Sequence, residues 1–254
     1  MSPRRKREWF DDDGFWRDLY PFMFPETRFE AAVVDMPRLI RLARPRGRSV
    51  LDLACGPGRF STAFAKRGYR VTGVDRTRYL LDRARARAKT AKVQVEWVRE
   101  DMRDFVRPDA FDLALSLFTS FGYFQDKSED VRVLRQVLES LRPGGALVVE
   151  VLGKEQIAGI FAPVSADKLG DALLVQRREI FDEWTRIWNE WTLVRGGRAR
   201  TYEFSHTIYS GQELRERFEQ AGYSSVKLYG NFDGEPYQRR SPRLVAVGWK
   251  GSRR

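Results

Sequence analysis

The chain has 254 residues, 42% of them hydrophobic, and a formal net charge of +11 at pH 7. This composition suits one globular domain with an elaboration, and no apolar run approaches the ~20 residues of a membrane-spanning helix. The basic N-terminus lacks the apolar stretch of a signal peptide, and one cysteine with one histidine leaves neither a disulfide nor a usual zinc site. We therefore expect a cytoplasmic protein without a metal.

Aromatic side chains crowd the first 25 residues. They are Trp9, Phe10, Phe15, Trp16, Tyr20, Phe22 and Phe24. This segment either packs over the edge of a sheet or closes as a lid that excludes water from a bound ligand. Between Pro25 and Arg44, apolar residues recur at helical spacing and predict an amphipathic helix. We assign residues 1–45 to an aromatic lid segment and its helix.

Apolar strands alternate with helices over residues 46–152. Strands are predicted at 50–53, 71–75, 93–98, 111–118 and 146–151, with helices resuming at residue 60 and covering 79–90 and 128–141. This spacing is typical of right-handed βαβ units in a parallel sheet, where ligands bind at the carboxyl ends of the strands.

The loop after the first of these strands predicts a cofactor site. Gly56 and Gly58 have no side chain to keep their backbone N–H groups from a ligand, and Asp75 ends the next strand, where a ribose would lie. A dinucleotide fold would have a third glycine where Ser61 stands, and the Asp52 carboxylate would repel a pyrophosphate. S-adenosylmethionine carries no phosphate and bears positive charge, so the loop favours S-adenosylmethionine.

Beyond Gly153 the apolar residues alternate with a period of two. Strands at 172–181, 187–193 and 202–208, with a hairpin turn at 195–198, predict an antiparallel sheet of about three strands inserted after strand five. A helix over 211–221 and strands at 223–229 and 243–249 would complete a seven-stranded sheet. We assign 153–210 to a sheet covering an acceptor site, and 211–254 to the completion of the core.

Four short motifs carry a family resemblance. They are Leu-Asp-Leu-Ala-Cys-Gly-Pro-Gly at 51–58, Gly-Val-Asp at 73–75, Glu-Asp-Met-Arg-Asp at 100–104 and Leu-Arg-Pro-Gly-Gly at 141–145. Through them the chain resembles the class I S-adenosylmethionine-dependent methyltransferases. Residues 101–105 and 117–124 resemble a bacterial small-molecule branch that includes sugar amine N,N-dimethyltransferases. The resemblance implies a Rossmann-like α/β fold whose seven-stranded sheet is mostly parallel, with the last strand antiparallel.

The resemblance also implies how the cofactor is held. Asp75 would accept hydrogen bonds from the ribose hydroxyls, and Asp101 would lie near the adenine amino group. Each acid also has a structural interpretation, as a helix cap or as a solvated loop carboxylate. The predicted cofactor-binding residues are Tyr20, Asp52, Ala54, Cys55, Gly56, Gly58, Asp75, Arg76, Asp101, Met102, Arg103, Leu117 and Phe118.

Tyr123 and His206 are the candidate catalytic residues on the acceptor side. Tyr123 follows strand four, where acceptors enter, although an aromatic residue in this Phe-rich loop more often packs. His206 lies on the apolar register of the inserted sheet, where a structural role is commoner than that of a base. Cys55 would need this distant histidine as its base, so a small packing residue is the favoured interpretation.

The basic charge keeps a second class of function open. Arg4, Arg5, Lys6, Arg7, Arg253 and Arg254 could contact phosphates, as in an RNA methyltransferase. However, the Asn/Asp-Pro-Pro-Tyr motif of amino-methylating nucleic-acid enzymes is replaced by Leu-Phe-Thr-Ser-Phe-Gly-Tyr at 117–123. We therefore expect methyl transfer to a nitrogen or oxygen of a small molecule. An RNA methyltransferase and a non-catalytic S-adenosylmethionine-binding protein remain alternatives, and a homodimer is possible.

Overall fold

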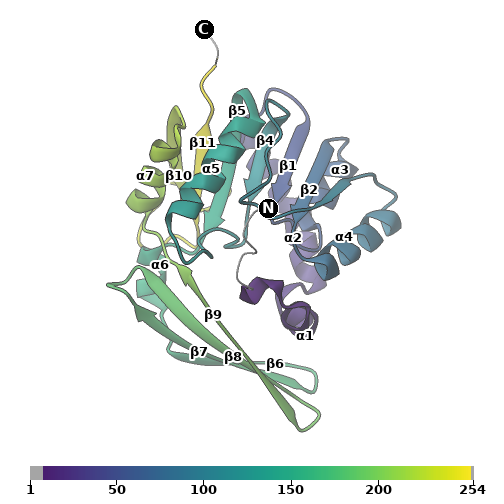
Figure 1. Ribbon diagram of the computed structural model, residues 1–254, viewed down its shortest axis with the longest axis vertical. Coiled ribbons are helices and arrows are strands. Elements are labelled where there is room, and N and C mark those ends of the chain that lie inside the picture. Colours follow the sequence, from purple (N-terminus) through teal and green to yellow (C-terminus); the bar gives the residue numbers. More distant parts are fainter. Residues whose placement is uncertain (1–7, 253–254) are drawn as a thin grey trace, which may run out of the picture.

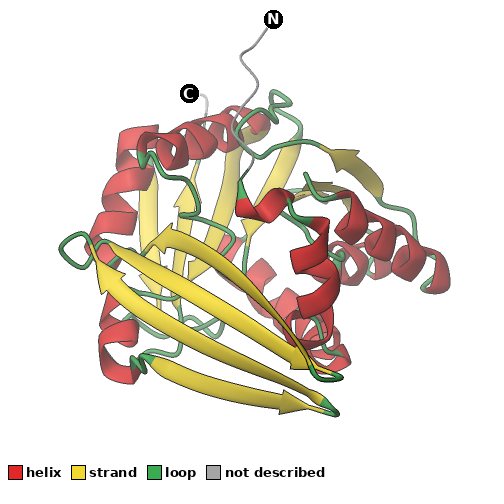
Figure 2. Ribbon diagram, turned by 60° about the horizontal axis from the view of Figure 1, so that its bottom comes forward, coloured by secondary structure: helices red, strands yellow, loops and turns green. Residues whose placement is uncertain are grey.

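The computed structural model describes residues 8–252, and these residues form two β-sheets (Figures 1 and 2). The larger sheet has seven strands in the order β10-β11-β5-β4-β1-β2-β3. Its strands are β1 (Ser49–Leu53), β2 (Arg70–Asp75), β3 (Glu96–Arg99), β4 (Phe111–Ser116), β5 (Leu141–Val151), β10 (Ser225–Tyr229) and β11 (Leu244–Trp249). Strands β1 to β5 pair in parallel, and β11 runs antiparallel to both of its neighbours. The predicted sheet is confirmed.

Helices cover both faces of this sheet and explain why its central strands β1 and β4 are buried along their whole length. They are α2 (Glu26–Ala43), α3 (Arg59–Lys66), α4 (Arg78–Thr90), α5 (Ser128–Ser140) and α7 (Gly211–Ala221). Leu51 and Leu53 of β1 pack with residues of α5 and α7, whereas Val50 packs with residues of α2 and α3. Because successive side chains of a strand point to opposite faces, both faces of β1 must be buried.

The smaller sheet is antiparallel and stands against the carboxyl end of the core (Figure 1). It contains β6 (Val164–Leu169), β7 (Ala172–Phe181), β8 (Arg186–Arg195) and β9 (Arg198–Thr207), and the short helix α6 (Lys154–Ile160) leads into it. The prediction of about three strands was therefore one strand short. Strand β6 is exposed along most of its length, so its sequence lacks the apolar alternation that marks the other three.

Two other strand boundaries differ from the sequence prediction. The third strand begins at Glu96 rather than residue 93, and the fourth ends at Ser116 rather than residue 118. Phe118 and Thr119 have φ values of +57° and +55°, which no β-strand can accommodate. The chain therefore turns sharply at the point where the fourth strand reaches the candidate ligand site.

The aromatic N-terminal segment joins the two sheets. It forms the 3₁₀ helix η1 (Trp9–Asp11) and the α-helix α1 (Asp13–Met23), which begins where the Asp12 side chain accepts from the Gly14 N–H at 2.8 Å. Phe15 and Leu19 of α1 are buried in a cluster with apolar side chains of β7, β8 and β9. Figure 1 shows α1 between the core and the smaller sheet. No helix of residues 8–252 is long and apolar enough to cross a membrane.

Close packing against Trp97 of β3 leaves no room for a side chain at Gly58. Gly58 precedes α3 with φ +75°, and a Cβ added there would lie 2.6 Å from the Trp97 ring and 3.1 Å from Ala84. Both the backbone angle and the lack of space therefore require glycine. This requirement is separate from any contact with a ligand.

Replacing Gly58 by alanine should lower the free energy of unfolding by about 2–5 kcal/mol. About 1–2 kcal/mol comes from a side chain at positive φ and about 1–3 kcal/mol from overpacking against Trp97. Gly196→Ala is the matched control, because Gly196 has φ +56° but no atom within 4 Å of an added Cβ. Urea unfolding should show the larger loss at Gly58, and equal losses would contradict the packing account.

Candidate functional site

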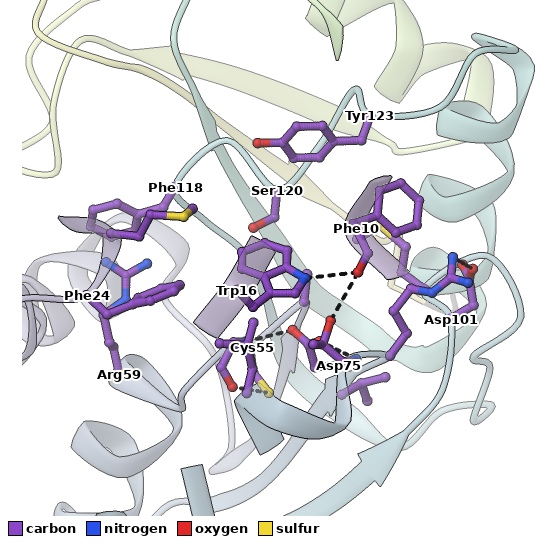
Figure 3. Close-up of a pocket in the computed structure, with 18 of the residues that line it drawn as sticks. Phe10, Trp16, Phe24, Cys55, Arg59, Asp75, Asp101, Phe118, Ser120 and Tyr123 are labelled. Carbon is purple, nitrogen blue, oxygen red and sulfur yellow. Dashed lines mark hydrogen bonds and ion pairs between the residues drawn. The ribbon is translucent and has the colours of Figure 1, made fainter. Parts of the chain in front are cut away.

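A cavity lies at the carboxyl ends of the central strands, between the core and the N-terminal segment (Figure 3). It holds about 900 Å³ of space free of protein atoms, part of it open to solvent. The loops after β1, β2 and β3 line one side, while Trp9, Phe10, Trp16 and Phe24 line the other.

The Asp75 carboxylate joins the loop after β1 to the end of β2. One of its oxygens accepts from the Gly56 N–H at 2.8 Å, and the other accepts from the Thr77 N–H at 2.8 Å. Burial raises the pKa of Asp75, while these backbone donors favour its charged form. Each carboxylate oxygen has a second lone pair, so Asp75 can still accept from a hydroxyl in the cavity.

Asp52 serves the helix behind the loop. Its Oδ2 accepts from the Ser61 backbone N–H at 2.9 Å and from the Ser61 hydroxyl at 2.5 Å, which satisfies a free donor in the first turn of α3. Burial raises the pKa of Asp52 to about 6. Ser61, at the position of the missing third glycine, is thus held by a carboxylate. Asp52 itself does not line the cavity.

A network of charged side chains closes the end of the cavity that lies next to Met102. The Asp101 Oδ2 lies 2.8 Å from Arg76 Nη1 and 2.7 Å from Arg103 Nη2, and Glu8 pairs with both arginines at 3.2 and 2.6 Å. Although burial by itself raises the pKa of Asp101, hydrogen bonds from Arg103 and the charge of Arg76 hold that pKa below its ordinary value. The network fastens η1 over the loops that follow β2 and β3.

Arginine side chains gather at the far end of the cavity, around Phe118. The Arg59 guanidinium lies 3.7 Å from the centroid of the Phe118 ring and 5.4 Å from that of Phe24, and Arg28 lies 6.0 Å from Phe118 (Figure 3). Burial and the nearby charge of Arg28 together lower the pKa of Arg59 to about 10, although the carboxylates of Asp52 and Glu150 oppose this shift. Arg59 Nη1 is buried without a hydrogen-bond partner among residues 8–252.

The carboxylate of Glu150 offsets the positive charge of these arginines only in part, and its charge raises the pKa of Arg28 and of Arg59. Its oxygens accept from the Phe118 N–H at 2.5 Å and from Arg243 Nη1 at 2.6 Å. The cavity therefore ends in positive charge with a free buried donor, which is the environment that a carboxylate ligand requires. Arg28 and Arg59 are not among the cofactor-binding residues predicted from the sequence. The only feature of the sequence that points to either as a site residue is that Arg59 directly follows Gly58.

Tyr123 and His206 are in contact but face the cavity differently. Tyr123 lines it, and its ring centroid lies 4.9 Å from that of Trp9 and 5.3 Å from that of His206. His206 does not line the cavity; burial lowers its pKa to about 4, and its Nδ1 has no hydrogen-bond partner in the described part of the chain. Burial also raises the pKa of Tyr123, so its hydroxyl stays protonated at neutral pH.

The cavity brings together most of the predicted cofactor residues. Those lining it are Ala54, Cys55, Gly56, Asp75, Arg76, Asp101, Met102 and Phe118. Those away from its lining are Tyr20, Asp52, Gly58, Arg103 and Leu117. Burial raises the pKa of the Cys55 thiol well above its ordinary value, which suits a packing residue better than a nucleophile.

Comparisons with known proteins identify the family. Residues 50–145 match the model of a methyltransferase domain. A cypemycin N-terminal methyltransferase from Streptomyces sp is 31% identical over 204 residues, which cover 79% of this chain and 82% of that protein. The chain belongs to the S-adenosylmethionine-dependent methyltransferases.

Other members of this methyltransferase family are similar over shorter stretches or in fold. A ubiquinone biosynthesis O-methyltransferase from Xanthomonas campestris is 28% identical over 167 residues, covering 65% of this chain and 64% of that protein. The structure of CalS10 with S-adenosylmethionine bound, an amino pentose methyltransferase from Micromonospora echinaspora, has a TM-score of 0.66 at 22% identity. The matched region covers 93% of this chain and 96% of the CalS10 chain. The predicted fold, enzyme class and cofactor are confirmed.

Replacing Asp75 by alanine should weaken S-adenosylhomocysteine binding by about 10- to 100-fold, because a charged acceptor for the ribose hydroxyls is lost. Asp112→Asn is the control, since Asp112 is also a buried strand carboxylate that accepts a backbone N–H, from Ser49 at 2.9 Å, but it lies away from the cavity. Calorimetric titration should find its affinity within about two-fold of the wild type. Unchanged affinity in the Asp75 variant would refute the ribose assignment.

Proposed function

We propose that this methyltransferase transfers the methyl group to an amine nitrogen of a small molecule. The observation that carries the proposal is the chemistry around Tyr123. Besides Tyr123, η1 and the loop after β4 contribute to the lining the rings of Trp9, Phe10, Phe118 and Phe124 and the hydroxyl of Ser120, which donates to the Leu117 carbonyl at 2.8 Å. Within the described residues, this part of the lining holds no group that is a base at neutral pH. An amine attacks once deprotonated, whereas a hydroxyl usually needs a general base.

The residues of the cavity fit S-adenosylmethionine along its whole length. The loop of Met102 would take the adenine, Asp75 the ribose, and Arg59 the carboxylate of the amino-acid tail. The buried, unpartnered Arg59 Nη1 supports this orientation, because the tail carries the only negative charge of the cofactor. When bound, the cofactor supplies a methyl group whose bond to sulfur breaks, with the electron pair passing to sulfur, as the bond to nitrogen forms.

The protein's contribution is to bind, orient and exclude water. Positioning of reactants can supply about 7–11 kcal/mol of rate acceleration without any catalytic base. The aromatic side chains of η1 and α1 close the cavity, and Trp16 is fixed by the hydrogen bond from its Nε1 to the Phe10 carbonyl at 2.9 Å. This arrangement supports the proposed lid. Tyr123 would orient the acceptor, and His206 would support the Tyr123 ring without receiving a proton.

The relatives support an amine acceptor, although they do not agree on the acceptor atom. One is named as an N-terminal methyltransferase and one as an amino pentose methyltransferase, whereas the ubiquinone relative is named as an O-methyltransferase. The terminal arginines on which the RNA alternative depends, Arg4, Arg5, Arg7, Arg253 and Arg254, lie outside the described residues, as does Lys6. The small-molecule names of the relatives favour the amine proposal over RNA.

The Arg59→Met variant tests whether Arg59 binds the amino-acid tail of the cofactor or its nucleoside. Loss of a charged hydrogen-bond donor should weaken S-adenosylhomocysteine binding by about 10- to 100-fold. The affinity for 5′-methylthioadenosine, which has the same nucleoside but no carboxylate, should stay within about two-fold. Arg87→Met is the control, because Arg87 also stacks on a ring, Phe29 at 3.5 Å, but pairs with Glu26. Equal losses for both ligands would contradict the assignment.

A methyl-transfer assay with matched amines and alcohols tests the acceptor atom. Amines should be methylated and the corresponding alcohols should not. Since a general base contributes about 10²–10⁴-fold, His206→Gln and Tyr123→Phe should keep kcat within about ten-fold of the wild type. Between pH 6 and 9, kcat/KM should rise because the amine loses its proton. His206, whose pKa burial lowers to about 4, stays neutral over this range and should not contribute to the pH dependence. Methylation of alcohols alone, with a greater than 100-fold loss in His206→Gln, would overturn the proposal.

A further inference from the structure

A second cavity adjoins the cofactor cavity on the far side of Trp9 and Tyr123. It is an open groove between η1, the loop after β4, helix α5 and the smaller sheet. Trp9, Phe10 and Tyr123 line both cavities, so these three side chains form the wall between them. In Figure 3 the Tyr123 ring stands at the margin of the cofactor cavity, next to Ser120. A molecule in the groove therefore has only side chains between itself and the cofactor cavity.

Arg186 differs from the other charged side chains of the groove in its ion pairing. The others each have an opposite charge within 4.0 Å; they are Glu8, Arg103, Glu129, Arg132 and Asp182. Arg186 at the start of β8 forms no ion pair with any residue in the range 8–252, and it is only 8% exposed. A buried charge without a counter-charge is costly, so such a group usually has a binding partner.

The hydrogen bonds of Arg186 all go to neutral acceptors. Its guanidinium donates to the carbonyls of Phe124 and Gln125 at 3.3 Å each, to the Thr207 hydroxyl at 3.5 Å and to the Ser205 hydroxyl at 3.2 Å. None is shorter than 3.2 Å, whereas a charge-assisted bond to an oxyanion measures about 2.7–2.9 Å. Ser205 also lines the groove, which places a hydroxyl donor beside the guanidinium.

Neither nearby acid forms an ion pair with Arg186, although the charge of Arg186 lowers the pKa of both Asp130 and Asp182. Asp130 accepts from the Tyr209 hydroxyl at 2.6 Å inside the core, and Asp182 accepts from the Thr185 hydroxyl at 2.8 Å and pairs with Lys127 at 3.5 Å. Both carboxylates thus have other partners and lie beyond ion-pair distance of Arg186. An oxyanion in the groove could receive two donors from Arg186 and one from Ser205.

We propose that this groove is the acceptor site and that Arg186, with Ser205, binds a carboxylate or phosphate group of the acceptor. The acceptor is then an amine that also carries an oxyanion. Arg186 donates to the carbonyl of Phe124, the residue next to Tyr123, so an anion bound there lies close to the wall between the cavities. For the amine to reach the cofactor, the wall that Trp9 and Tyr123 form would have to open. This inference rests on the proposed amine methylation.

Calorimetric titration of the full-length protein saturated with S-adenosylhomocysteine tests the anion site directly. The probes are pyrophosphate and glutarate, at constant ionic strength. Wild type should bind at least one of them, and the tighter probe tells whether the site favours phosphate or carboxylate. Arg186→Gln should weaken that binding by about ten-fold or more, and Arg186→Lys should restore part of it.

Arg178→Gln is the matched control. Arg178 lies on the same sheet and also donates to neutral acceptors, including the Ser165 hydroxyl at 2.9 Å, but it is away from the groove. Its variant should bind the probe as the wild type does. Binding of S-adenosylhomocysteine shows whether each variant is folded, and it separates failure of the anion site from failure of the cofactor site. A wild type that binds neither probe, or equal affinities in Arg186→Gln and Arg178→Gln, would overturn the proposal.

Discussion

The hydrogen bonds of Asp75 are the constraint on which the functional site depends. One buried carboxylate takes the N–H of Gly56 from the loop after β1 and the N–H of Thr77 from the turn after β2. The two turns are thereby held side by side at the edge where parallel strands end, with a negative charge between them. Burying this carboxylate costs free energy, which its two backbone donors offset in part. Asp75 also lines the cavity, so its carboxylate can accept a further hydrogen bond from a ligand.

The rest of the site is built outward from these two turns. On one side, Arg76 follows Asp75 directly and joins Asp101 to Glu8 and Asp11, so the loops and the N-terminal segment share one network of charges. On the other side, Glu150 of β5 captures the Phe118 N–H and holds the chain in its left-handed turn. In the cavity between them, the acids near Met102 are paired with arginines, whereas Arg59 has a buried donor without a partner within the described residues. This difference orients a ligand that has one carboxylate at one end.

The sequence predicts those parts of the fold that local interactions decide. Helix α7 spans 211–221 as predicted, because Ser210 and Glu213 form a capping box at its start. The parallel core follows from its apolar strands and its glycine turns. Strand β6 was missed because an exposed edge strand needs no alternation of apolar residues. The early end of β4 was missed because the Glu150 carboxylate that fixes Phe118 lies more than 30 residues away along the chain.

The candidate site shows the same division. Asp75, Asp101 and Gly56 stand in motifs, and all three line the cavity. Arg59 and Arg186 stand in no motif. Only the folded chain reveals that Arg59 Nη1 is buried without a hydrogen-bond partner and that Arg186 is buried without an ion pair, both within residues 8–252. Gly58 and Asp52 belong to the motif, yet their contacts are with Trp97 and Ser61 rather than with the cavity. A motif therefore mixes residues that would touch the ligand with residues that support those contacts.

A crystal structure of the protein with S-adenosylhomocysteine would test the central claim most directly. We expect the adenine against Met102, the ribose hydroxyls within about 2.6–3.0 Å of the Asp75 carboxylate, and the amino-acid carboxylate on Arg59 Nη1. A tail that points away from Arg59, or a ribose bound elsewhere than at Asp75, would contradict it.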